Sequence, residues 1–105
     1  MKYVVFLFFL LCNLAQAQDS ITLVVPFPAG GNYDMWARSL QPSLEKELNQ
    51  PVIVENRPGA GGAIAASYVA NAPRSKHVML ITNTSIFVNY IITPNYNIHR
   101  LNYVA

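Results

Sequence analysis

The hydrophobic positions of this chain fall into short runs that predict the order of its strands. Residues 21–25 are rich in β-branched side chains and end at Pro26, which predicts a buried strand. Residues 52–54 and 78–81 are similar apolar runs and predict two further strands. We therefore expect three short strands, separated by segments long enough to hold helices.

The segment between the first two predicted strands has the period of a helix. Apolar residues recur there at every fourth position, at Trp36, Leu40, Leu44 and Leu48. This spacing predicts an amphipathic helix with these side chains on one face. Asn32 or Asp34 is expected to cap its start by accepting a backbone hydrogen bond, and Pro42 is expected to bend it. Asn49, which tolerates left-handed backbone geometry, and Pro51 mark its end.

Two further helices complete the predicted order of elements. Residues 63–72 are rich in alanine and predict a helix, and residues 86–92 predict a shorter one. Strand, loop and helix repeated in this way predict an α/β fold with parallel strands joined by right-handed crossovers. The loops that follow the three strands should then meet at one edge of the sheet, where open α/β folds bind ligands.

The N-terminal segment has the pattern of a secretory signal peptide. Lys2 is followed by the apolar run of residues 3–12, and residues 15–17 are the small-residue ending Ala-Gln-Ala. This predicts export to the periplasm and cleavage after Ala17. The apolar run is shorter than the roughly 20 residues of a membrane span. Cys12 is the only cysteine, and the bulky leucines before it disfavour lipid attachment there.

Charge and composition exclude several classes of protein. The 105 residues leave room for one domain at most, and they carry seven basic and five acidic side chains. Once Lys2 is removed with the leader, six basic side chains remain against five acidic ones, so the chain has no basic stripe for nucleic acid. His77 and His99 have no acid or nucleophile beside them in a catalytic arrangement. We therefore predict no catalytic residue, no metal ligand and no cofactor.

Two glycine-rich loops are the strongest candidates for a ligand-binding site. Residues 26–31 and 56–62 each lead from a predicted strand into a predicted helix. Backbone N–H groups at such helix starts favour anions, although each loop is also explained by a tight turn alone. The second loop is not a dinucleotide fingerprint, because Ile64 stands where the third glycine or alanine belongs.

Two motifs resemble a known family. Residues 24–38 read VVPFPAGGNYDMWAR, and residues 49–62 read NQPVIVENRPGAGG. They match the patterns V-P-[FY]-P-x-G-G-x-x-D-x-x-A-R and Q-P-V-x-V-E-N-[RK]-P-G-A-G-G in order and at the usual separation. The chain thus resembles the Bug/TctC family, the extracytoplasmic solute-binding receptors of tripartite tricarboxylate transporters.

The resemblance implies a periplasmic-binding-protein fold of the second type, in which two α/β lobes close on a small carboxylated solute and deliver it to a membrane permease. Backbone groups and bridging water near the first two loops would hold the carboxylate, with Asp34 ordering its loop. The implied ligand-binding residues are Phe27, Ala29, Gly30, Gly31 and Asp34, then Gly59, Ala60, Gly61 and Gly62, and finally Thr82, Asn83, Thr84 and Ser85. No reaction is implied.

The chain departs from the family pattern in two ways. Residues 73–77 read PRSKH where the family has a P-D-G-Y turn, so the third strand is expected to start differently or to be less stable. The family is also several times longer, and residues 18–105 would form only the N-terminal part of the first lobe. If Ala105 is the natural end, two alternatives stay open: a truncated relic of a receptor, or a one-lobe interaction module.

Overall fold

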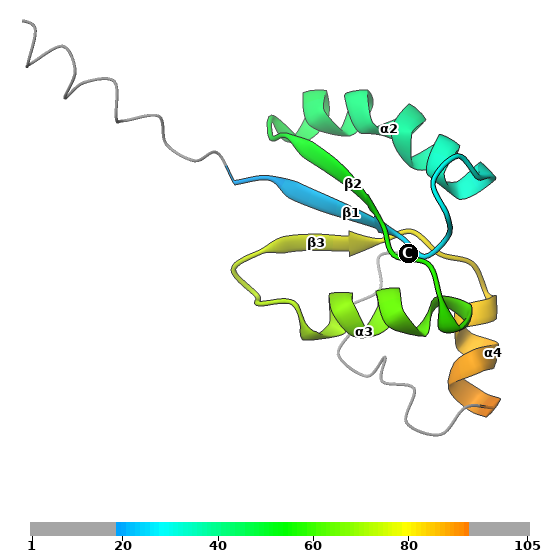
Figure 1. The fold of residues 1–105 in the computed structure, drawn as a ribbon. Helices are drawn as coiled ribbons and strands as arrows, with labels where there is room; N and C mark the ends of the chain where they lie inside the picture. The colour runs from blue at the N-terminus through cyan, green and yellow to red at the C-terminus, as the bar shows by residue number, and fades with distance from the viewer. Residues whose placement is uncertain (1–18, 93–105) are drawn as a thin grey trace, which may run out of the picture.

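The computed structural model describes residues 19–92, which form a three-stranded parallel sheet between helices (Figure 1). The strands are β1 (Ile21–Val25), β2 (Val52–Asn56) and β3 (His77–Leu80), in the order β2-β1-β3. Both pairings are parallel, with Leu23 opposite Val54 in β2 and Met79 in β3. The predicted α/β fold with parallel strands is confirmed.

The helices follow the strands in the predicted alternation. They are α2 (Asn32–Leu48), α3 (Ala63–Asn71) and α4 (Ser85–Ile92), with a 3-10 turn, η2 (Ala60–Gly62), directly before α3. Figure 1 shows α2 and α3 on opposite sides of the sheet. Several boundaries differ from the sequence prediction by one or two residues. β2 extends to Asn56, β3 covers His77–Leu80 instead of 78–81, and α3 ends at Asn71 instead of residue 72. Ser85 is the first residue of α4 rather than part of the preceding loop.

The core is centred on β1, because this strand has a neighbour on both edges and helices on both sides. Leu23, Val24 and Val25 are fully buried, as the continuous apolar run predicted. Val52 of β2 and Ala37 of α2 form one cluster with Leu23 and Val25. The carboxyl end of β1, from which the first loop starts, therefore lies in the packed core.

Most of the predicted apolar stripe of α2 does not contact the sheet, because only Leu44 of its four residues packs against the core. Trp36 is 64% exposed and Leu40 is 49% exposed, whereas Ala37 is completely buried. The helix is rotated so that the row containing Asp34, Ala37 and Leu44 approaches the sheet. Polar bonds to the start of β2 contribute to this rotation: Gln41 Nε2 lies 2.6 Å from the carbonyl oxygen of Val52, and the Val52 N–H donates to Glu45.

The ends of α2 test the predicted caps. Gly31 is the N-cap residue and Asn32 is already helical, so the prediction of Asn32 as the cap is wrong. Asp34, the third helical residue, instead reaches back to accept the N–H of Gly30, the residue before the N-cap. Asn49 ends the helix with φ 50° and ψ 39°, which confirms its left-handed geometry.

Some predictions fall outside the described residues. The signal peptide, residues 1–17, is one of them, and His99 is another. Between residues 19 and 92, no helix has the length and apolar character needed to cross a membrane.

Candidate ligand-binding site

Three loops leave the carboxyl edge of the sheet side by side. They are residues 26–31 after β1, residues 57–59 with η2 after β2, and residues 81–84 after β3. Backbone bonds hold the latter two against the end of β1, because Arg57 N lies 2.8 Å from the Val25 oxygen and Ile81 N lies 2.9 Å from the Val24 oxygen. The predicted convergence of the loops is confirmed.

The first loop presents the start of α2. Its first helical bond runs from Met35 N to Gly31 O, at 2.9 Å, so the N–H groups of residues 32–34 have no intrahelical partner. The N-cap residue, Gly31, has no side chain that could accept a hydrogen bond from these groups. Phe27 is half-buried and stacks on Tyr33, with ring centroids 4.5 Å apart. Ala29, Gly30 and Gly31 are exposed. The Gly30 N–H donates to Asp34 and the Gly31 N–H donates to the Pro28 oxygen.

Asp34 lies beneath this loop and is 3% exposed. The Arg38 side chain, the Gly30 N–H and the Asn56 side chain all donate to its carboxylate and lower its pKa to about 2. The carboxylate is therefore ionised at neutral pH, with both oxygens occupied by protein donors. This geometry supports the loop-ordering role that the resemblance implied.

The second loop has positive φ at four successive residues, Gly59, Ala60, Gly61 and Gly62. At Gly61, a Cβ would lie 2.6 Å from Nδ2 of Asn89, which donates to the Gly61 oxygen at 2.8 Å. Glycine is therefore favoured at Gly61 by its φ of 61° and by the approach of Asn89 from α4. Gly62 is buried and is the N-cap residue of α3.

The third loop forms the start of α4. Asn83 Oδ1 accepts the Ser85 N–H at 3.1 Å and also the Ser85 hydroxyl, which makes an Asx turn. Thr82 is half-buried, whereas Thr84 is exposed. The polar atoms of Asn83 and Ser85 thus hydrogen-bond to each other at the start of α4.

The sequence analysis missed three side chains that organise these loops. Asn56 bonds to the first loop, Asn89 bonds to the second, and the Arg57 guanidinium lies 3.6 Å from the ring centroid of Tyr68 in α3. Arg57 also pairs with Glu55. Asn56 and Arg57 lie inside the second motif, so the motif indicated that they matter. It did not indicate their partners, Phe27 and Tyr68, because these lie outside the motif.

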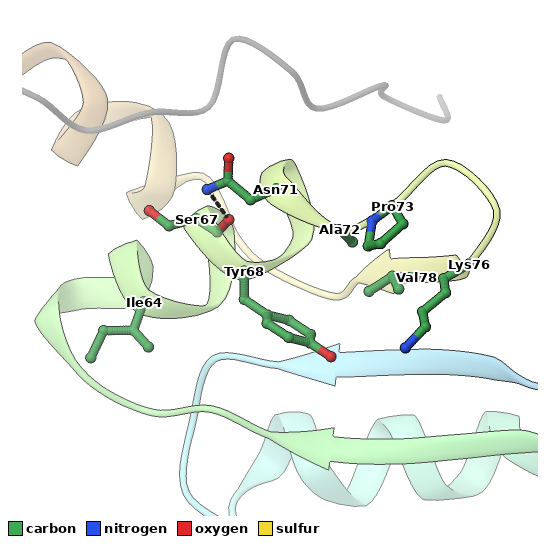
Figure 2. A pocket seen from close by; sticks show the side chains of 8 residues that line it. All are labelled: Ile64, Ser67, Tyr68, Asn71, Ala72, Pro73, Lys76 and Val78. Carbon is green, nitrogen blue, oxygen red and sulfur yellow. Dashed lines mark hydrogen bonds between the residues drawn. The ribbon is translucent and has the colours of Figure 1, made fainter.

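A separate groove of about 440 Å³ lies along α3 and the start of β3 (Figure 2). The residues that line it are Ile64, Ser67, Tyr68, Asn71, Ala72, Pro73, Lys76 and Val78. None of the predicted ligand-binding residues is among them. Within residues 19–92 there is also no group of three or more metal-ligating side chains.

Comparison with known proteins agrees with this architecture. The family described as "Tripartite tricarboxylate transporter family receptor" matches residues 36–105. Protein BugT of Bordetella pertussis is 42% identical over 65 residues, which are 62% of this chain and 20% of BugT.

Two solved structures share the fold. A TctC solute-binding protein from Polaromonas superposes with a TM-score of 0.66 and 33% identity, covering 76% of this chain and 28% of that one. R. palustris Rpa4515, solved with adipate, gives a TM-score of 0.60 and 39% identity, covering 68% of this chain and 24% of its own.

The described residues thus form part of a lobe of a periplasmic binding protein. Within that class, the chain belongs to the Bug/TctC family of tripartite tricarboxylate transporter receptors, of which it represents the N-terminal portion. This is a family of solute-binding receptors that act in the periplasm, and it is not an enzyme family. The chain spans between 20% and 27% of the length of the curated relatives it matches.

Proposed function

We propose that the protein to which this chain belongs binds a small carboxylate in the periplasm and delivers it to the permease subunits of a tripartite transporter. The observation that carries this proposal is the convergence of two glycine-rich loops at one sheet edge, each directly before a helix. The N–H groups of residues 32–34 at the start of α2, which have no intrahelical partner, suit a carboxylate.

We infer the roles of the three loops from the family resemblance and from their common position at this edge of the sheet. Loop 26–31 would contribute backbone contacts at Ala29, Gly30 and Gly31, above the stacked ring of Phe27. Residues 59–62 would provide the second wall of the site, and Thr82 to Ser85 would border it. Residues 18–105 would then be the beginning of the first lobe, and the remaining walls would come from sequence that follows.

A thermal-shift titration of the full-length protein tests the proposal. The panel is adipate, citrate, glutamate and benzoate, which sample dicarboxylates, tricarboxylates, amino acids and aromatic acids. We expect at least one to raise the Tm, because a ligand at 100 times its Kd stabilises the folded state by about 2.7 kcal/mol. The uncharged amide of the same compound is the matched control and should leave the Tm unchanged.

The outcomes of this titration separate the proposal from its alternatives. Stabilisation by a carboxylate but not by its amide contradicts the hypothesis of a binding-incompetent relic. Equal stabilisation by both compounds, or by neither, contradicts carboxylate recognition. If neither compound stabilises the protein, a binding-incompetent relic or an interaction module without a solute becomes the better explanation.

Export is a separate proposal with its own measurement. The predicted signal peptide places the mature N-terminus at Gln18. We expect the native protein recovered from the periplasm to have an intact mass that begins at this residue. An Ala17→Leu variant is the control, because a bulky residue at the cleavage site should leave the leader attached. Recovery of the uncleaved form of the native protein from the cytoplasm would contradict the proposal.

A further inference from the structure

Asn56 connects the two glycine-rich segments through its side chain. It is the last residue of β2 and immediately precedes the second loop. Its Nδ2 donates to the carbonyl oxygen of Phe27 at 3.1 Å and to Oδ1 of Asp34 at 2.9 Å. Its Oδ1 lies 3.5 Å from Nη2 of Arg38. One amide thus contacts the first loop directly and also contacts the carboxylate below it.

The contact continues into the exposed backbone of the first loop. The other oxygen of Asp34 accepts the Gly30 N–H at 2.8 Å, so Asn56, Asp34 and Gly30 form a continuous series of hydrogen bonds. Because Asp34 is buried, solvent competes weakly for these bonds. The position of the Gly30 backbone therefore depends on a side chain that comes from the second motif.

We propose that Asn56 is a positioning residue that sets the spacing between the first and second loops and thereby the affinity for the carboxylate. The proposal rests on the proposed function and assigns no ligand contact to Asn56. An amide suits this role because it donates both hydrogens to two acceptors, whereas alanine leaves the Phe27 oxygen and Asp34 Oδ1 unpaired. Aspartate would place a second carboxylate beside Asp34.

The chain offers a matched control at the other end of β2. Gln41 also connects α2 to β2 by one side-chain bond, to the carbonyl oxygen of Val52 at 2.6 Å. Val52 begins the strand, and the loops leave its opposite end. A Gln41→Ala variant therefore removes a comparable connection without touching the Asn56 network.

The test measures amide hydrogen exchange and carboxylate affinity in the full-length protein carrying Asn56→Ala, Asn56→Asp or Gln41→Ala. The probe is adipate, citrate, glutamate or benzoate, whichever raises the Tm of the wild type most. For both Asn56 variants we expect faster exchange in residues 26–31 and an affinity about tenfold weaker. For Gln41→Ala we expect wild-type exchange in residues 26–31 and wild-type affinity, even if its Tm falls.

A double variant that exchanges the amide and the carboxylate tests the pairing of Asn56 with Asp34. Asp34→Asn combined with Asn56→Asp restores one amide opposite one carboxylate, although Phe27 loses its donor. We expect slower exchange in residues 26–31 than in Asn56→Asp alone. No difference between the double variant and Asn56→Asp would overturn the pairing.

The remaining outcomes of the test also support or overturn the proposal. Equal loop exchange in Gln41→Ala and Asn56→Ala overturns the proposal, because the effect would then reflect general stability. Faster loop exchange with unchanged affinity overturns the link to binding. If no carboxylate binds the wild type, the proposed function fails, and the exchange comparison alone supports or overturns the positioning role.

Discussion

Valine in place of Gly31 is expected to abolish carboxylate binding in the full-length protein while its fold is retained. Gly31 has φ −77° and ψ 174°, an extended conformation that valine adopts readily. A Cβ there would contact only the Pro28 oxygen, at 3.4 Å, so the folded state accepts it. The added methyl groups would project from an exposed position directly before the free N–H groups of α2.

The expected loss of affinity is at least about a hundredfold, because a side chain at this position would keep the carboxylate away from the backbone. Isothermal titration with the carboxylate that stabilises the wild type measures this loss, and circular dichroism verifies the fold. Unchanged affinity in a folded Gly31→Val protein would place the site elsewhere.

Gly61 is the informative comparison, since a valine there should damage both binding and folding. Its φ of 61° disfavours any residue with a Cβ by about 1–3 kcal/mol. The new atom would also collide with Asn89, which is bonded to the Gly61 oxygen. We expect Gly61→Val to lower the Tm and Gly31→Val to leave it nearly unchanged. Equal Tm values for the two variants would contradict the loop geometry described here.

The order of strands and helices was predictable because it depends on local pattern. The β-branched run of residues 21–25 predicts one strand, and the apolar residue at every fourth position of residues 36–48 predicts one helix. The rotation of α2 was not predictable in this way, because Trp36 and Leu40 have the right period but lie beside the contact face. That rotation accompanies the bonds from Gln41 and Glu45 to β2, which no helical period reveals.

The candidate site also has one part that the sequence pattern predicts and another part that it does not. The glycine-rich loops and their common edge follow from sequence spacing and from parallel pairing. Asn56 and Asn89 were missed because their partners lie 22 to 29 residues away, so that only the fold brings them together. Asp34 was assigned correctly to its loop, but the sequence gives no sign that Asn56 completes its hydrogen bonding. Long-range polar pairs are thus the part of this site that pattern does not show.

Asp34 should make the stability of the protein depend on pH in acid. Its pKa in the folded protein is about 2, below the ordinary value of 3.8, because Arg38, Gly30 and Asn56 all donate to its carboxylate. Between these two values the unfolded chain binds more protons than the folded one, so stability rises with pH. The contribution is complete above the ordinary value and is lost as the pH falls from 3.8 towards 2.

Asp34→Asn removes this contribution, because a neutral amide has no charge to titrate and accepts the Arg38 and Gly30 bonds more weakly. We expect the variant to be less stable than the wild type at pH 7, and the difference to shrink steadily as the pH approaches 2. Urea unfolding of the full-length protein at pH 7, 5, 4, 3 and 2 measures the difference. Glu47→Gln, which removes an exposed carboxylate from the same helix, is the control. A difference between wild type and Asp34→Asn that stays constant over this range would show that the Asp34 carboxylate is not held by its three donors.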